Sequence, residues 1–233
     1  MTTAIQQKQF QAGAPTRYNI YVAVHKGLRG FMVDTLTQLG KVDVTDACEF
    51  ASVIEQVSSL LKTCLSHVHS ENTFLHPVME KARAQSSSRT DDDHVEHLRE
   101  IDALQRQVAQ LLAAPESARA FLTRSLYLRM SRFVAENFEH MVTEETDNHE
   151  VLIATCSDQD LLQIEGAIVA SHTPEENMLF LRWMLVYMNT DERVFLLNGM
   201  KHAMPPEMFQ AILVLARENL SQRDYFKMEK ALA

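Results

Sequence analysis

Glycine and proline are both scarce in this chain, with only 6 of each among 233 residues. Because these residues interrupt regular secondary structure, their scarcity favours long helices joined by short connections. Cysteine is scarcer still, and the odd count of 3 excludes a disulfide framework of the kind that holds small secreted proteins together. Such sparse cysteine is typical of a protein that works in the reducing cytoplasm.

Positive charge is also in short supply, because 22 Lys and Arg stand against 31 Asp and Glu, a net charge of −9. No basic face is left to neutralise phosphates, so we expect no nucleic-acid partner. The most apolar run, residues 183–188, is far too short to span a membrane. Residues 1–17 are polar and lack the apolar core of a signal peptide. We therefore expect a soluble, cytoplasmic protein.

Apolar residues recur at spacings of three and four over four long segments, which is the pattern of amphipathic helices. We expect these helices at about residues 16–40, 46–84, 92–113 and 116–154, the second with Thr45 as its N-cap. Four or five shorter helices should follow, two of them opened by capping boxes at residues 157–160 and 173–176. No strand alternation, glycine-rich phosphate loop or sequence repeat is evident.

These patterns predict an all-α fold in three parts. Residues 1–15 form a flexible N-terminus, residues 16–156 an up-down four-helix bundle, and residues 157–233 a smaller helical C-terminal extension. The extension is rich in methionine, and we expect it to pack against the bundle. The alternative is that it forms a surface for a homodimer or another protein partner, because methionine adapts to irregular contacts.

Histidine and glutamate are plentiful, and their spacing carries the functional interpretation. A histidine followed by a glutamate four residues later places both side chains on one helix face. About one such pair is expected by chance, and this chain has four. Two of them are expected to lie outside the core: His76 and Glu80 share a polar face and should be solvated, while His172 and Glu176 straddle a helix start.

The other two pairs, His67/Glu71 and His140/Glu144, fall on the inward stripes of the second and fourth helices. A charged glutamate in an apolar stripe is costly unless it is paired or coordinates a metal ion. Two such pairs on different helices are what a buried dinuclear metal site requires. The alternative for each histidine taken alone is a core residue whose ring is satisfied by a hydrogen bond.

The first and third helices each add inward histidines. His25 lies on the stripe of the first helix, and both His94 and His97 can face the interior from the third. We favour His94 as the metal ligand, with His97 as an alternative ligand or a support for one. His69, His149 and His202 are expected to take no part.

The order of these residues resembles that of hemerythrin-like, or HHE cation-binding, domains. Those domains carry a lone histidine on the first and third helices and a His-x-x-x-Glu motif on the second and fourth. Residues 67–77 are similar to the second-helix motif, including the proline at position 77, and residues 138–145 to the fourth-helix motif with its paired glutamates. Asp93-His94 is similar to the acidic-His pair that opens the third helix. The resemblance covers residues 16–155, with one departure at Asn72, where many members have a second glutamate.

The resemblance implies a centre of two non-haem iron ions with the two glutamates as candidate bridges. Its ligands would be His25, His67, Glu71, His94, His140 and Glu144. Imidazole and carboxylate ligands suit iron, although zinc or manganese could occupy the same set. A small diatomic ligand, O₂ or NO, would be the expected partner.

Three functions from different classes follow, in order of preference. The first is the binding or sensing of O₂, NO or iron itself. The second is a di-iron redox enzyme, with peroxidase-like or iron-centre repair activity. The third is a helical interaction protein in which the metal site is structural.

Overall fold

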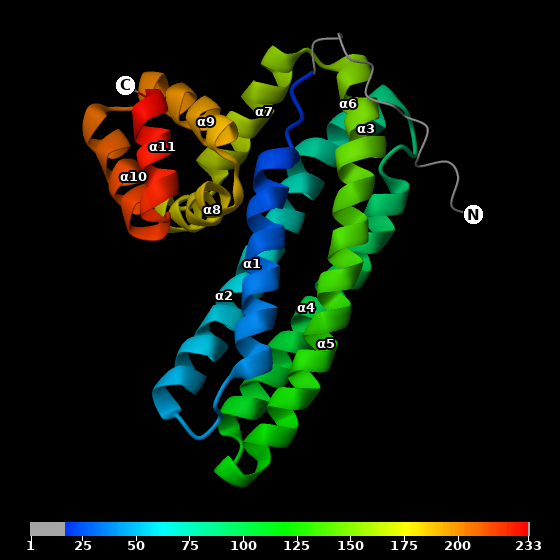
Figure 1. Ribbon diagram of the computed structural model, residues 1–233. Helices are drawn as coiled ribbons and strands as arrows, with labels where there is room; N and C mark the ends of the chain where they lie inside the picture. Colours follow the sequence, from blue (N-terminus) through cyan, green and yellow to red (C-terminus); the bar gives the residue numbers. More distant parts are fainter. Residues whose placement is uncertain (1–16, 233) are drawn as a thin grey trace, which may run out of the picture.

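The computed structural model describes residues 17–232, and these form helices and short connections without a strand (Figure 1). The predicted flexible segment, residues 1–15, lies outside the described residues. Four long helices run side by side: α1 (Val22–Lys41), α2 (Ala47–Ser70), α4 (Ser88–Ala113) and α5 (Glu116–Thr143). Helices α1 and α4 each pack against both α2 and α5. The prediction of an all-α fold is confirmed.

The long helices bury their apolar stripes against one another, as the spacing of three and four predicts. The resulting cluster includes Phe31, Leu60, Leu104 and Phe133, each no more than 1 % exposed. A second apolar cluster lies towards the other end of the helices and includes Leu75, Met79 and Leu152. The inward polar residues of α2 and α5 fall between these two clusters, so water is excluded on both sides of them.

Helices α2 and α5 each pass through one wider turn before they end. Helix α2 continues through a π-helical turn, η2 (Glu71–Leu75), into α3 (His76–Ala82). Helix α5 continues in the same way through η3 (Glu144–Asn148) into α6 (His149–Thr155). The predicted second and fourth helices therefore have nearly the right extent, but each contains a local change of register.

Several predicted helix starts were wrong by a few residues. Helix α1 begins at Val22 rather than near residue 16, and α4 begins at Ser88 rather than near residue 92. The N-cap of α2 is Asp46 rather than Thr45, because the Asp46 carboxylate accepts hydrogen bonds from the backbone N–H groups of Cys48 and Glu49. The Thr45 hydroxyl instead donates to Asp43.

Five shorter helices follow, and the expected capping boxes open α7 and α8. The helices are α7 (Asp158–Ser171), α8 (Pro174–Tyr187), α9 (Thr190–Ala203), α10 (Pro206–Asn219) and α11 (Gln222–Leu232). Helices α8 to α11 share an apolar cluster of their own, and α8 packs closely against α1. No helix within residues 17–232 combines the length and apolar character needed to cross a membrane.

Candidate metal centre

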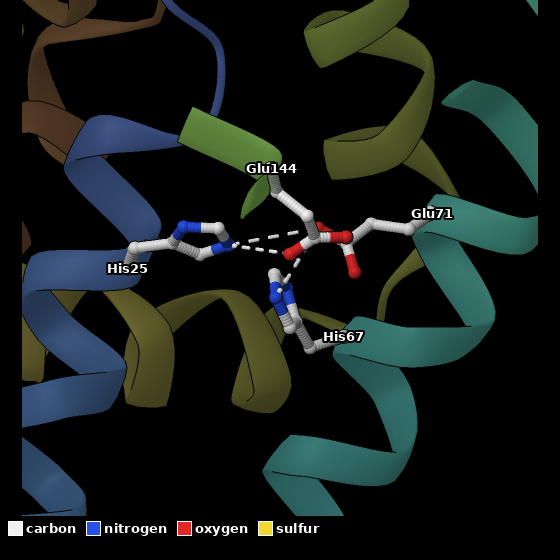
Figure 2. A group of neighbouring side chains, drawn as sticks. All are labelled: His25, His67, Glu71 and Glu144. Atoms are coloured by element: carbon white, nitrogen blue, oxygen red, sulfur yellow. Dashed lines mark ion pairs between the residues drawn. The ribbon is translucent and has the colours of Figure 1, made fainter. Parts of the chain in front are cut away.

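Six of the seven predicted ligands come together near one end of the four long helices, where His25 lies in the first turn of α1 and His67 and His140 lie in the last turns of α2 and α5. His25, His67, Glu71 and Glu144 form one group, and Glu71, His94, His140 and Glu144 form a second. Within each group the potential ligand atoms all lie within 4.8 Å of one another. Figure 2 shows the first group, in which α1, α2 and the two π-helical turns η2 and η3 direct their side chains toward one point. The two groups share both glutamates.

The two carboxylates each face both groups. One oxygen of Glu71 lies 3.6 Å from Nε2 of His25 and 3.3 Å from Nε2 of His67, and its other oxygen lies 3.4 Å from Nε2 of His94. Glu144 is arranged the same way. Its Oε2 lies 3.4 Å from His25, and its Oε1 lies 3.6 Å from His94 and 3.2 Å from His140. Each carboxylate is therefore oriented as a bridge between two positions would be.

The oxygen and nitrogen atoms that face the centre make few hydrogen bonds with one another, which leaves them available to cations. Both oxygens of Glu71 and of Glu144, and Nε2 of His25 and of His67, are buried without a hydrogen-bond partner among the described residues. Glu71 is 2 % exposed and Glu144 is fully buried. Carboxylates that accept no hydrogen bond are costly in such surroundings, and divalent ions would compensate both charges. Mixed imidazole and carboxylate donors suit iron, zinc and manganese. The buried His and Glu groups are thus compatible with a metal site.

A second set of contacts orients three of the histidines. Nδ1 of His25 lies 3.0 Å from Glu145, and Nδ1 of His94 lies 2.6 Å from the side-chain oxygen of Asn72. Nδ1 of His140 lies 3.2 Å from Asp93. A ring that donates from Nδ1 presents the lone pair of Nε2 to the opposite side, which is the usual arrangement for a metal-binding histidine. All three Nε2 atoms accordingly point toward the glutamates.

The two halves of the centre follow one pattern, which the sequence analysis missed when it found no repeat. His67, Glu71 and His76 on one helix have the same spacing as His140, Glu144 and His149 on the other. In both, the π-helical turn begins at the glutamate.

The residue after each glutamate also plays the same part in both halves. Asn72 contacts His94 on α4, and Glu145 contacts His25 on α1. Asn72 therefore has, like Glu145, an acceptor oxygen directed at a histidine of the centre. π-helical turns of this kind are often found at functional sites.

The ionisation of the site reflects the close approach of imidazoles and carboxylates. Burial alone would lower the pKa of His25, but the hydrogen bond to Glu145 and the nearby carboxylate of Glu71 outweigh it and raise the pKa to about 9. Burial would also lower the pKa of His94, but the carboxylates of Glu144 and Glu71 outweigh it and raise this pKa to about 10. Burial would raise the pKa of Glu71, yet the neighbouring imidazoles hold it well below its usual value. Cations bound here would replace those protons, so metal binding should weaken as the pH falls.

The remaining predicted residue, His97, lies outside both groups. Its side chain is 4 % exposed, and its ring centre lies 4.8 Å from that of His140. The structure therefore gathers His94, rather than His97, with the glutamates. His69 and His202 are exposed, as expected, and His149 is half-buried and belongs to neither group.

The prediction that His76 is solvated was wrong. His76 is 4 % exposed, its ring stacks on His94 at a centroid distance of 4.9 Å, and Nδ1 contacts Asp91. The cause is the wider turn η2, which rotates every residue after Glu71 relative to a regular α-helix. A helical wheel drawn through Glu71 cannot show this. His172 does precede the N-cap of α8, as expected.

Comparisons of the chain with protein families, with curated proteins and with solved structures each returned no match. The interpretation of the site therefore depends on its residues and their geometry.

Proposed function

We propose that the protein is a hemerythrin-like, non-haem di-iron protein that binds or senses O₂, NO or iron. In this proposal α1, α2, α4 and α5 form the up-down bundle of that family. His25 and His67 would hold one ion, His94 and His140 would hold the other, and Glu71 and Glu144 would contribute to both. The observation that carries the proposal is the pair of buried carboxylates, each with one oxygen directed toward each group and no hydrogen-bond partner among the described residues.

Iron fits this donor set, and when bound it supplies open coordination positions for a small diatomic ligand. The chain contributes the binding, the orientation and the exclusion of water. Asn72, Asp93 and Glu145 fix the rings of three histidines. Tyr21 and Met141, which are 1 % and 2 % exposed, belong to the apolar clusters on either side of the centre. Such an apolar surrounding favours a small uncharged ligand over a polar substrate.

The proposal is tested with protein loaded anaerobically with Fe(II) and then exposed to O₂ or to NO. We expect a new visible absorption band that disappears when the gas is removed, because the ligand binds without being consumed. The Glu55→Ala variant is the matched control, since Glu55 is exposed on α2 and the variant should behave as the original chain does. A chain that takes up no iron would contradict the whole proposal. A loaded protein that shows no spectral response to either gas would exclude O₂ and NO as its ligands, and continuous consumption of the gas would indicate an enzyme instead.

A further inference from the structure

A cavity of about 860 Å³ lies between α4 and α5 and ends at the candidate centre. His140, which belongs to one of the two ligand groups, forms part of its wall, and so does Asp93, whose carboxylate contacts Nδ1 of His140. Another cavity, of about 670 Å³ beside α6, contacts none of the six candidate ligands. The cavity between α4 and α5 therefore borders the buried site at His140.

Negative charge predominates along this cavity. Five carboxylates line it against three arginines. Two of these carboxylates are neutralised, Glu100 by Arg129 at 2.9 Å and Glu96 by Arg99. The other three carboxylates still outnumber the two remaining arginines. Glu136 and Glu139 lie within one turn of His140 on α5, and both are exposed. A cleft lined mostly by one sign of charge concentrates ions of the opposite sign. The lining therefore favours a cation over an anionic or apolar molecule.

His97 provides a second and independent observation. It lines the cavity, it is 4 % exposed, and its Nδ1 is buried without a hydrogen-bond partner among the described residues. A buried polar group that lacks a partner lowers stability. An apolar side chain would therefore pack here at a lower cost than an imidazole that binds nothing. Its ring meets that of His140 edge-on, with the centres 4.8 Å apart. An ion held by His97 would thus lie next to His140, a candidate ligand.

We infer that this cavity is the entry route for the divalent cation, and that His97 binds the ion transiently before it passes to His140. The inference rests on the proposed metal centre and adds the path by which that centre is filled. Because His97 stands outside both ligand groups, its loss should slow loading without changing how many ions are finally held.

The test compares the rate of Fe(II) uptake, followed anaerobically by stopped flow, with the final number of ions per chain. We expect His97→Gln to load about tenfold more slowly and to reach the same final stoichiometry as the original chain. The double variant Glu136→Gln/Glu139→Gln, which changes only exposed side chains, should also load more slowly, and added salt should slow the original chain more than this variant. His69→Gln is the matched control on an exposed histidine and should load at the original rate.

The possible results separate the entry route from the centre itself. Equal loading rates in His97→Gln, in the double variant and in the original chain would overturn the entry route while leaving the centre intact. A lower final stoichiometry in His97→Gln would also overturn it, because His97 would then be a permanent ligand. An original chain that takes up no ion would overturn both the route and the proposed centre.

Discussion

At the scale of single residues, the proposed metal centre depends on two carboxylates, Glu71 and Glu144, that belong to both ligand groups. Glu71→Ala should therefore weaken the binding of both ions, whereas His67→Ala removes a ligand from one group and should leave about one ion tightly bound. The measurement is the number of ions retained after equilibrium dialysis. Glu55→Ala, a change at an exposed position of the same helix, should retain both. Equal losses in the Glu71 and His67 variants would argue against shared bridges.

Asn72 tests the contacts that orient the histidines. Replacing it by Ala removes the oxygen that accepts from Nδ1 of His94, and the affinity for metal should fall by about 10- to 100-fold. Asn72→Asp keeps an acceptor and should retain most of the affinity. Thr73→Ala, at the exposed position next to it, should change nothing. The Asn72 contact would be irrelevant to the site if Asn72→Ala bound metal as well as the Thr73 variant.

The same residues predict how stability depends on pH in the cation-free protein. The pKa of His25 is raised to about 9, so its contribution is complete below pH 6.5 and is lost as the pH rises through 9. Burial lowers the pKa of His67 to about 4, so its contribution is lost as the pH falls from 6.5 through 4. Stability should therefore be highest near pH 6.5 and decline on both sides.

Thermal unfolding of metal-free protein at pH 5, 6.5 and 9 measures this directly. The alkaline decline from His25 alone should be on the order of 3 kcal/mol once the pH exceeds 9. His25→Gln should lose that part of the alkaline decline. A midpoint temperature that stays constant or rises from pH 6.5 to pH 9 would be inconsistent with the raised pKa of His25.

At the scale of secondary structure elements, the π-helical turns decide which residues face inward. A helical wheel places His76 beside exposed polar residues, but η2 turns it inward against His94. His76→Ala should therefore lower the free energy of unfolding by about 2 to 4 kcal/mol. His69→Ala, two turns earlier and exposed, should cost less than about 0.5 kcal/mol. Chemical denaturation of both variants tests this. An equally small loss of unfolding free energy in the two variants would show that His76 is exposed to solvent.

The elements also show how far the sequence could be used. Apolar spacing was enough to predict the four long helices, and a Ser or Thr followed three residues later by Asp or Glu predicted the capping boxes at residues 157–160 and 173–176. The pairing of histidine with glutamate predicted four of the six residues that the structure brings together, and the apolar stripes of the first and third helices predicted His25 and His94. The π-helical turns could not be predicted, because one extra residue per turn leaves no mark in composition or in the spacing before it. Helix starts were also uncertain by several residues, since neighbouring polar side chains such as Thr45 and Asp46 compete for the N-cap.

At the scale of the whole molecule, the C-terminal helices are attached to the long helices through α8. This contact needs glycine on α1, because a Cβ atom at Gly30 would lie 2.1 Å from the ring of Tyr187. Trp183, the only tryptophan in the chain, stacks on Phe31 with the ring centres 4.1 Å apart. Sequence analysis predicted that these helices pack on the bundle but gave no indication of the role of Gly30.

The Trp183 ring makes this contact measurable. Gly30→Leu should separate α8 from α1 and shift the fluorescence of Trp183, now 9 % exposed, toward the red as water reaches it. Gly166→Leu is the control, since nothing lies within 4 Å of a Cβ at that position, and its emission should match that of the original chain. Unchanged emission in Gly30→Leu would show that α8 does not depend on this close approach.

The proposed centre requires that the long helices hold two cations at once. The most direct measurement is the iron content of the full chain after anaerobic loading with Fe(II) and removal of free ion by gel filtration. Two irons per chain are predicted. A value near zero, or one that stays at a single iron in excess Fe(II), would contradict the shared-carboxylate centre.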